Sequence, residues 1–123
     1  MIILDYRDRR PLNEQVAEKL QALILNGVLK PGSRMPSVRD LSMELSINPN
    51  TVQRAYVELE RRGLIYPVRG RGNFVSEDAG IIERKKGEAL EALRAALDAC
   101  QSAGISRVEV LEAARAWVEE KYD

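Results

Sequence analysis

Residues 36–75 read PSVRDLSMELSINPNTVQRAYVELERRGLIYPVRGRGNFV, and they contain the clearest helix and turn signals of the chain. Ser37, followed three residues later by Asp40, is typical of a capping box at the start of a helix, although Asp is a weaker choice there than Glu. Apolar residues then repeat at helical spacing, at Val38, Leu41 and Leu45. We therefore predict a short amphipathic helix that ends in a tight turn over residues 45–48.

A second helix is predicted to start at Asn48 as the N-cap, with Pro49 at the first helical position, where proline is tolerated. Gly63 ends this helix after two arginines that suit a helix C-terminus. Its apolar face consists of Val52, Ala55, Tyr56 and Leu59. Its other face carries hydrogen-bonding groups in the first two turns, at Asn50, Thr51, Gln53 and Arg54. Side chains of this kind read base edges, and helix N-terminal amides bind phosphate.

A β-hairpin is predicted over residues 64–76, with Arg-Gly-Arg-Gly at its tip. Gly70 and Gly72 permit positive φ angles, and Arg69 and Arg71 can reach phosphates or a narrow minor groove. Two helices, a tight turn and a hairpin in this order indicate a winged helix-turn-helix, which lays its second helix in the major groove of DNA. An ordinary solvated helix face followed by an ordinary glycine turn is the alternative.

Further helices are predicted on both sides of the central stretch. Before the central stretch we expect an extended arm over residues 1–10 and a helix over residues 11–27. Arg7, Arg9 and Arg10 either touch DNA or keep the arm soluble. After the hairpin come a polar joint over residues 77–80, a long helix over residues 81–103 that starts or bends at Gly87, and a last helix from residue 106 to residue 122.

The two last helices carry more apolar surface than they can bury against each other. The residues concerned are Leu90, Leu93, Leu97, Leu111, Trp117 and Val118. Such faces need a partner, so we predict a homodimer formed through this tail; docking onto the same chain is the alternative. The predicted class is mostly α with a small β-hairpin: a DNA-binding winged helix-turn-helix over residues 1–76 and a two-helix dimerisation or effector tail over residues 77–123.

Composition narrows the class of protein further. The 123 residues are 45% hydrophobic and 31% charged, as in a soluble globular chain, without an apolar run of membrane-spanning length or a signal peptide, so we expect the cytoplasm. Histidine is absent and Cys100 is the single cysteine, so we expect no metal site, no cofactor and no catalytic triad, and a packing role for Cys100.

The zero net charge hides an asymmetry between the two parts of the chain. Residues 1–76 hold 12 lysines and arginines against 8 acidic residues, a net +4, whereas residues 77–123 hold 7 against 11, a net −4. A basic first part and an acidic tail fit DNA binding by the first part alone.

Taken together, these motifs resemble the GntR family of transcriptional regulators and, within it, the small YtrA-like subfamily. The resemblance rests on Gln15-Val16, on the stretches 27–32 (GVLKPG), 34–41 (RMPSVRDL) and 48–56 (NPNTVQRAY), and on the wing 70–75 (GRGNFV). It implies that Arg39 of the Pro-Ser-x-Arg motif, which Ser37 opens, contacts DNA. It also implies that base reading begins at Asn48 and continues through Asn50, Thr51 and Gln53, and that Gly70 or Gly72 lies near the minor groove.

One departure from the wider family concerns the operator. Many members outside the subfamily carry arginine where this chain has Gln53, and arginine prefers guanine whereas glutamine prefers adenine. The short tail is another departure, since large ligand-sensing domains are usual in the family. The tail offers too little chain for a deep pocket, yet a small-molecule effector could bind between protomers. The resemblance implies a homodimeric repressor of a transporter-type operon that binds an inverted-repeat operator in double-stranded DNA.

Two other functions are alternatives to the DNA-binding repressor. A winged-helix module that binds a protein without reading DNA would favour an apolar or acidic recognition face, whereas this face is polar and basic. A small enzyme that holds phosphate in the Gly70/Gly72 loop would need the Walker lysine and Ser/Thr pattern, which the loop lacks.

Overall fold

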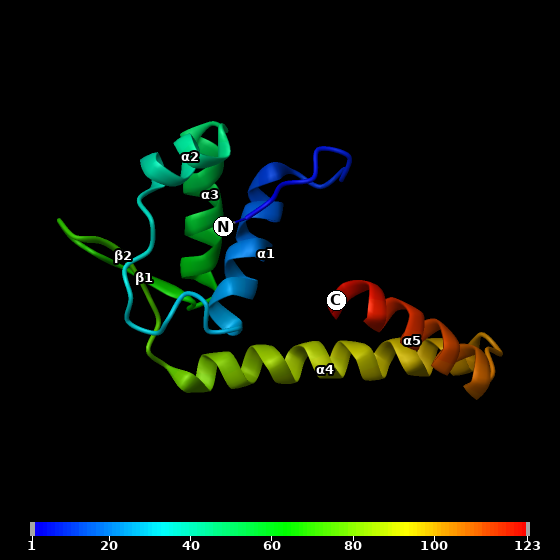
Figure 1. Cartoon of the computed structure of the whole chain (residues 1–123). Coiled ribbons are helices and arrows are strands. Elements are labelled where there is room, and N and C mark those ends of the chain that lie inside the picture. Colours follow the sequence, from blue (N-terminus) through cyan, green and yellow to red (C-terminus); the bar gives the residue numbers. More distant parts are fainter. Residues whose placement is uncertain (1, 123) are drawn as a thin grey trace. The chain divides into compact units, whose positions relative to one another are not determined.

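The computed structural model describes residues 2–122 (Figure 1). The elements in chain order are α1 (Leu12–Leu25), α2 (Val38–Leu45), α3 (Pro49–Arg61), β1 (Ile65–Val68), β2 (Gly72–Val75), α4 (Ala79–Ser102) and α5 (Arg107–Tyr122). The predicted class, mostly α with one small β-hairpin in a winged helix-turn-helix, is confirmed. Internal contacts divide the chain into two compact units, one that ends at Ile82 and one that begins at Glu83.

The three helices α1, α2 and α3 and the hairpin enclose the core of the first unit (Figure 1). Helix α3 is the central element, because it contacts α1, α2 and β1. The apolar side chains that are almost completely buried are Val16, Ala17, Leu20, Ile24, Met35, Leu41, Val52, Ala55, Tyr56, Leu59, Leu64, Ile65 and Val75. The apolar faces predicted for α2 and α3 therefore point into this core, with Val38 and Leu45 half-buried at its edge.

The turn between α2 and α3 gives the helix-turn-helix its shape. Helix α2 begins as predicted, with the Ser37 Oγ accepting a hydrogen bond from the Asp40 N–H at 3.0 Å. It ends at Ser46, which adopts a left-handed conformation with φ 56°. Glycine is the usual residue at such a position, so a serine here was not foreseen from the sequence. Asn48 then caps α3, as predicted.

The wing is an antiparallel hairpin with a third strand-like segment beside it. Strands β1 and β2 pair from Ile65↔Val75 to Val68↔Gly72, and residues 69–71 form the loop. The segment that leads into α2 bonds to the other edge of β2: the Val75 N–H donates to the Ser33 oxygen at 2.8 Å, and the Met35 N–H donates to the Asn73 oxygen at 2.8 Å. The lead-in to α2 is thereby held to the wing.

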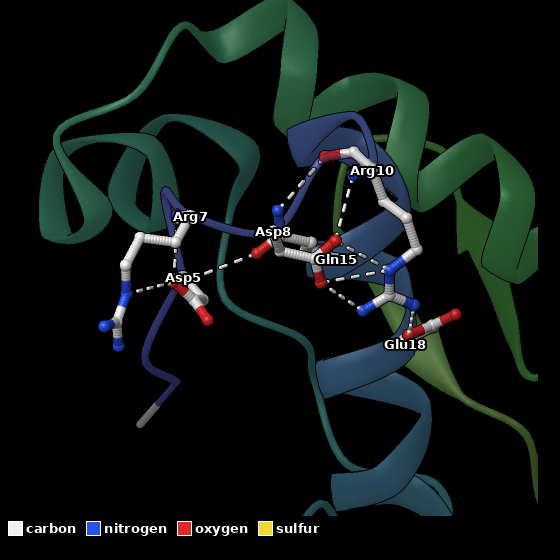
Figure 2. A network of polar contacts seen from close by, with 6 residues as sticks. All are labelled: Asp5, Arg7, Asp8, Arg10, Gln15 and Glu18. Atoms are coloured by element: carbon white, nitrogen blue, oxygen red, sulfur yellow. Dashed lines mark hydrogen bonds and ion pairs between the residues drawn. The ribbon is translucent and has the colours of Figure 1, made fainter.

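The N-terminal segment is fastened to α1 and is not the extended arm that we predicted (Figure 2). The side-chain oxygen of Gln15 accepts a hydrogen bond from the Asp5 N–H at 3.1 Å, and its amide donates to the Arg10 carbonyl oxygen at 3.1 Å. Arg10 binds both Asp8 and Glu18, and its hydrogen bonds hold the pKa of the Asp8 carboxyl below the ordinary value. We call this arrangement of residues 5–10 on Gln15 and Glu18 the N-terminal clasp. It arises because Gln15 lies within the apolar face of α1.

The tail consists of α4 and α5. Helix α4 starts at Ala79 and runs without interruption through Gly87, so the predicted start or bend at that glycine does not occur. Ser106 and Glu109 form the predicted reciprocal capping box at the start of α5, with bonds of 3.2 Å and 3.4 Å. The first turn of α4 belongs to the first unit, because Ile81 packs against its core.

Candidate nucleic-acid interface

The first two turns of α3 present polar side chains to solvent. Asn50 and Gln53 are exposed on the side away from the core, and Thr51 is half-buried. Asn48 uses its Oδ1 to accept a hydrogen bond from the Asn50 N–H at 2.8 Å. That capping bond occupies the oxygen of Asn48, while within residues 2–122 its amide group donates to no other residue. The exposed amide groups of this face are hydrogen-bond donors and acceptors of the kind that can pair with base edges.

Tyr56 ties this helix to the segment that leads into α2. Its hydroxyl donates a hydrogen bond to the Pro36 carbonyl oxygen at 2.6 Å. A tyrosine hydroxyl is protonated at neutral pH, and burial raises the pKa of Tyr56 still further, so the hydroxyl is a donor. Pro36 directly precedes Ser37, the cap of α2. The bond therefore fixes the start of α2, where Arg39 is exposed, against α3.

Arginines on α2 and the wing carry positive charge without local compensation. Arg39, Arg69 and Arg71 are exposed, and none of them forms an ion pair with another residue of the described chain. Gly70 and Gly72, between and beside the wing arginines, have φ angles of 79° and 106°, as predicted for this loop. An exposed arginine without a carboxylate partner is available to an anion outside the protein.

The arginines at the other end of α3 behave differently. Arg61 and Arg62 both bind Glu58, with 3.1 Å between the Arg62 Nε and the Glu58 Oε1. Their hydrogen bonds, that from Arg61 first, lower the pKa of Glu58 from 4.5 to about 2. Two guanidinium groups therefore share one carboxylate at this end of the helix, so Arg61 and Arg62 are partly compensated within the protein. Arg39, Arg69 and Arg71 have no such carboxylate partner among the described residues.

Arg54, which we grouped with the base-reading residues, lies at the edge of α3 that faces α1. It lines a groove of about 450 Å³ together with Glu14, Glu18 and Glu58. Successive helical residues are separated by about 100°, so Gln53 and Arg54 point in different directions. Asn50 and Gln53 therefore lie on one exposed face of α3, whereas Arg54 lies in an acidic groove on another side of the helix.

Arg34 is a cation of the wing that the sequence analysis did not single out. It pairs across to Phe74 on β2, and its guanidinium lies beside Gly72. The stretch around Arg34 has no alternating pattern that would mark it as a strand. Its position beside the wing therefore becomes visible only in three dimensions.

The tail residues predicted to form a dimer are exposed. Their exposed fractions are 66% for Leu90, 56% for Leu93, 45% for Leu97, 58% for Leu111, 62% for Trp117 and 53% for Val118. Helices α4 and α5 also enclose an apolar cavity of about 180 Å³, which Cys100 helps to line. Neither helix contains a single buried residue, so within this chain the tail has no core of its own.

The described part of the chain lacks two further kinds of feature. No helix within residues 2–122 is long and apolar enough to cross a membrane. Over the same residues, no group of three or more His, Cys, Asp or Glu side chains is placed to hold a metal ion.

Comparison with known proteins identifies the family. The model for the bacterial regulatory proteins of the gntR family matches residues 12–75, from the start of α1 to the end of β2. The HTH-type transcriptional repressor YtrA of Bacillus subtilis (strain 168) is 39% identical over 122 residues, covering 98% of this chain and 91% of that protein.

Solved structures agree with this assignment. A GntR family transcriptional regulator from Listeria monocytogenes matches with a TM-score of 0.76 and 32% identity, covering 95% of this chain and 98% of that one. AraR(DBD) in complex with operator ORE1 matches with a TM-score of 0.54 and 28% identity, covering 62% of this chain and 93% of that one. Because the family match spans the helix-turn-helix and the wing, and the similarity to YtrA extends through the tail, the chain is a YtrA-like transcriptional regulator of the GntR family.

Proposed function

We propose that this regulator is a repressor that binds an inverted-repeat operator in double-stranded DNA as a homodimer. The observation that carries the proposal is the exposed polar face of α3, at Asn50 and Gln53, accompanied by uncompensated arginines on α2 and the wing. Its relative from Bacillus subtilis is named as a transcriptional repressor, and AraR(DBD) was solved on an operator. Both support this assignment.

The proposed contacts divide into two classes. Gln53, with Asn48, Asn50 and Thr51 beside it, reads base edges in the major groove. Arg39, Arg69 and Arg71 bind phosphates, and Ser37 supports Arg39 by fixing the first turn of α2. Gly70 and Gly72 let the backbone of the wing approach the minor groove closely. Arg54 is also proposed to contact DNA, but the carboxylates that line the same groove reduce its attraction for phosphate.

The proposed domains are the DNA-binding part over residues 1–76 and the dimerisation tail over residues 77–123. The exposed leucines of α4 and the exposed Trp117 of α5 support dimerisation, because they would be covered in a two-fold dimer. Such a dimer presents two recognition helices about one duplex turn, or a multiple of it, apart. An effector would then bind between protomers. Since regulators of this family act on DNA, we place the protein in the cytoplasm, and by subfamily resemblance we propose a transporter-type operon as its target.

Selection of bound duplexes from a random DNA pool tests the proposal. We expect enrichment of an inverted repeat whose half-site centres are separated by about 10 base pairs or a multiple. A variant with Arg39, Arg69 and Arg71 all changed to alanine serves as the control and should retain no duplex at the same salt concentration. If the folded wild-type protein enriched no sequence, the protein-interaction alternative would replace the repressor.

A further inference from the structure

Arg34 lies on the outward face of the wing. Residues 33–35 bond to β2 as a third strand, and Arg34 is the cross-strand partner of Phe74. Directly opposed residues of an antiparallel pair share a face. Phe74 in turn opposes Tyr66 on β1, and the two rings stack with centroids 6.0 Å apart. Met35 is buried on the inner face, so Arg34 points outward with the two aromatic rings.

The guanidinium of Arg34 extends from this position toward the tip of the wing. An ideal Cβ placed on Gly72 would lie 3.4 Å from the Arg34 Nε and 3.6 Å from the Nη2. Gly72 is two residues nearer to the tip than Phe74. Because Gly72 has no side chain, the flat guanidinium can lie directly against the backbone of β2. The position of the Arg34 guanidinium therefore depends on both Gly72 and the β-bridge between Arg34 and Phe74.

The charges around Arg34 point to an external anion. Arg34 is exposed and, like Arg69 and Arg71, makes no ion pair with any residue in the range 2–122. Arginines elsewhere in the unit, such as Arg10 and Arg62, are bound to carboxylates. Three like charges on one small hairpin repel one another, and an external anion removes that repulsion.

We propose that Arg34 binds a phosphate of the operator backbone and completes a cationic wing with Arg69 and Arg71. This inference rests on the proposed function, because it assigns a further contact to the same DNA complex. The guanidinium of Arg34 makes no ion pair among the described residues, and its planar fork suits phosphate oxygens. Arg34 thus connects the segment before α2 to the phosphate backbone.

Binding of the selected operator duplex and of an unrelated duplex, measured by fluorescence anisotropy over a series of salt concentrations, tests Arg34. Arg34→Gln keeps the length of the side chain and removes its charge. We expect weaker binding to both duplexes and a log–log salt slope that is flatter by about 0.9, the contribution of one phosphate contact. Arg34→Lys should keep most of the slope because it keeps the charge. Lys19→Ala, at an exposed position on α1, is the matched control and should change neither quantity.

The outcomes separate the two claims. If wild-type protein bound neither duplex, both the proposed function and the phosphate contact of Arg34 would be wrong. If Arg71→Ala flattened the slope while Arg34→Gln left it unchanged, the wing would bind DNA without Arg34, and this inference alone would be wrong. A loss confined to the operator duplex, with the slope unchanged, would instead make Arg34 a reader of sequence and overturn the phosphate assignment.

Discussion

At the scale of single residues, the amide of Gln53 is the group best suited to select a base. It is exposed on the face of α3 that points away from the core, and an amide can form two hydrogen bonds with the edge of adenine. We expect Gln53→Ala to weaken operator binding by roughly 1–3 kcal/mol and to relax the preference at one base pair of each half-site. Competition with duplexes that carry all four base pairs at each position measures this. Glu60→Ala, at an exposed position further along α3, is the control; an unchanged base preference in Gln53→Ala would rule out the assignment.

Glu58 makes the stability of the fold depend on pH. Its pKa is lowered from 4.5 to about 2 by hydrogen bonds from Arg61 and Arg62, so the folded state favours the charged carboxylate. The stabilisation is therefore fully present above pH 4.5 and is lost as the pH falls toward about 2. We expect the stability gap between wild type and Glu58→Gln to narrow over this range in urea unfolding experiments. If the difference in unfolding free energy between the two proteins stayed constant from about pH 6 to about pH 2, Glu58 would not be the source of the pH dependence.

At the scale of elements, the capping residues could be predicted from the sequence because they act locally. Ser37 and Ser106 accept hydrogen bonds from backbone groups three residues away, and the turn glycines act within their own loops. The contacts that the sequence did not reveal join distant segments. Tyr56 binds Pro36 twenty residues earlier, and Arg34 reaches Gly72 on another strand. Such pairs depend on how the elements pack, and no local periodicity encodes them.

The N-terminal clasp is another contact between separate segments that the sequence did not predict, and its contribution to stability can be measured. Gln15 is 2% exposed and satisfies two backbone groups, the Asp5 N–H and the Arg10 carbonyl oxygen. We expect Gln15→Ala to lower the free energy of unfolding by roughly 1–3 kcal/mol, because both groups lose their partner. Urea unfolding measures the change, with Lys30→Ala, at an exposed position after α1, as the control. A loss no larger than that of the control would show that the clasp does not stabilise the fold.

At the scale of the whole molecule, we propose that the tail determines how many chains act together. Each large apolar side chain that becomes fully buried contributes roughly 1.5–3 kcal/mol, so a few of the exposed tail residues can support a dimer after the costs of association. The contact boundary at Ile82 lies beyond residue 76, where the composition changes. The packing of Ile81 on the core joins the first turn of α4 to the first unit, and this contact between distant segments has no signal in the local sequence.

Sedimentation equilibrium of the full chain, alone and with the selected inverted-repeat duplex, tests the dimeric regulator most directly. The account predicts a mass of two chains at micromolar concentration and two chains on each duplex. Leu93→Glu, at a position 56% exposed in the chain, should give a monomer that binds the repeat weakly, whereas Val28→Glu, 64% exposed outside the tail, should remain a dimer. A wild-type protein that sediments as a monomer and binds an isolated half-site as tightly as the full repeat would contradict the central claim.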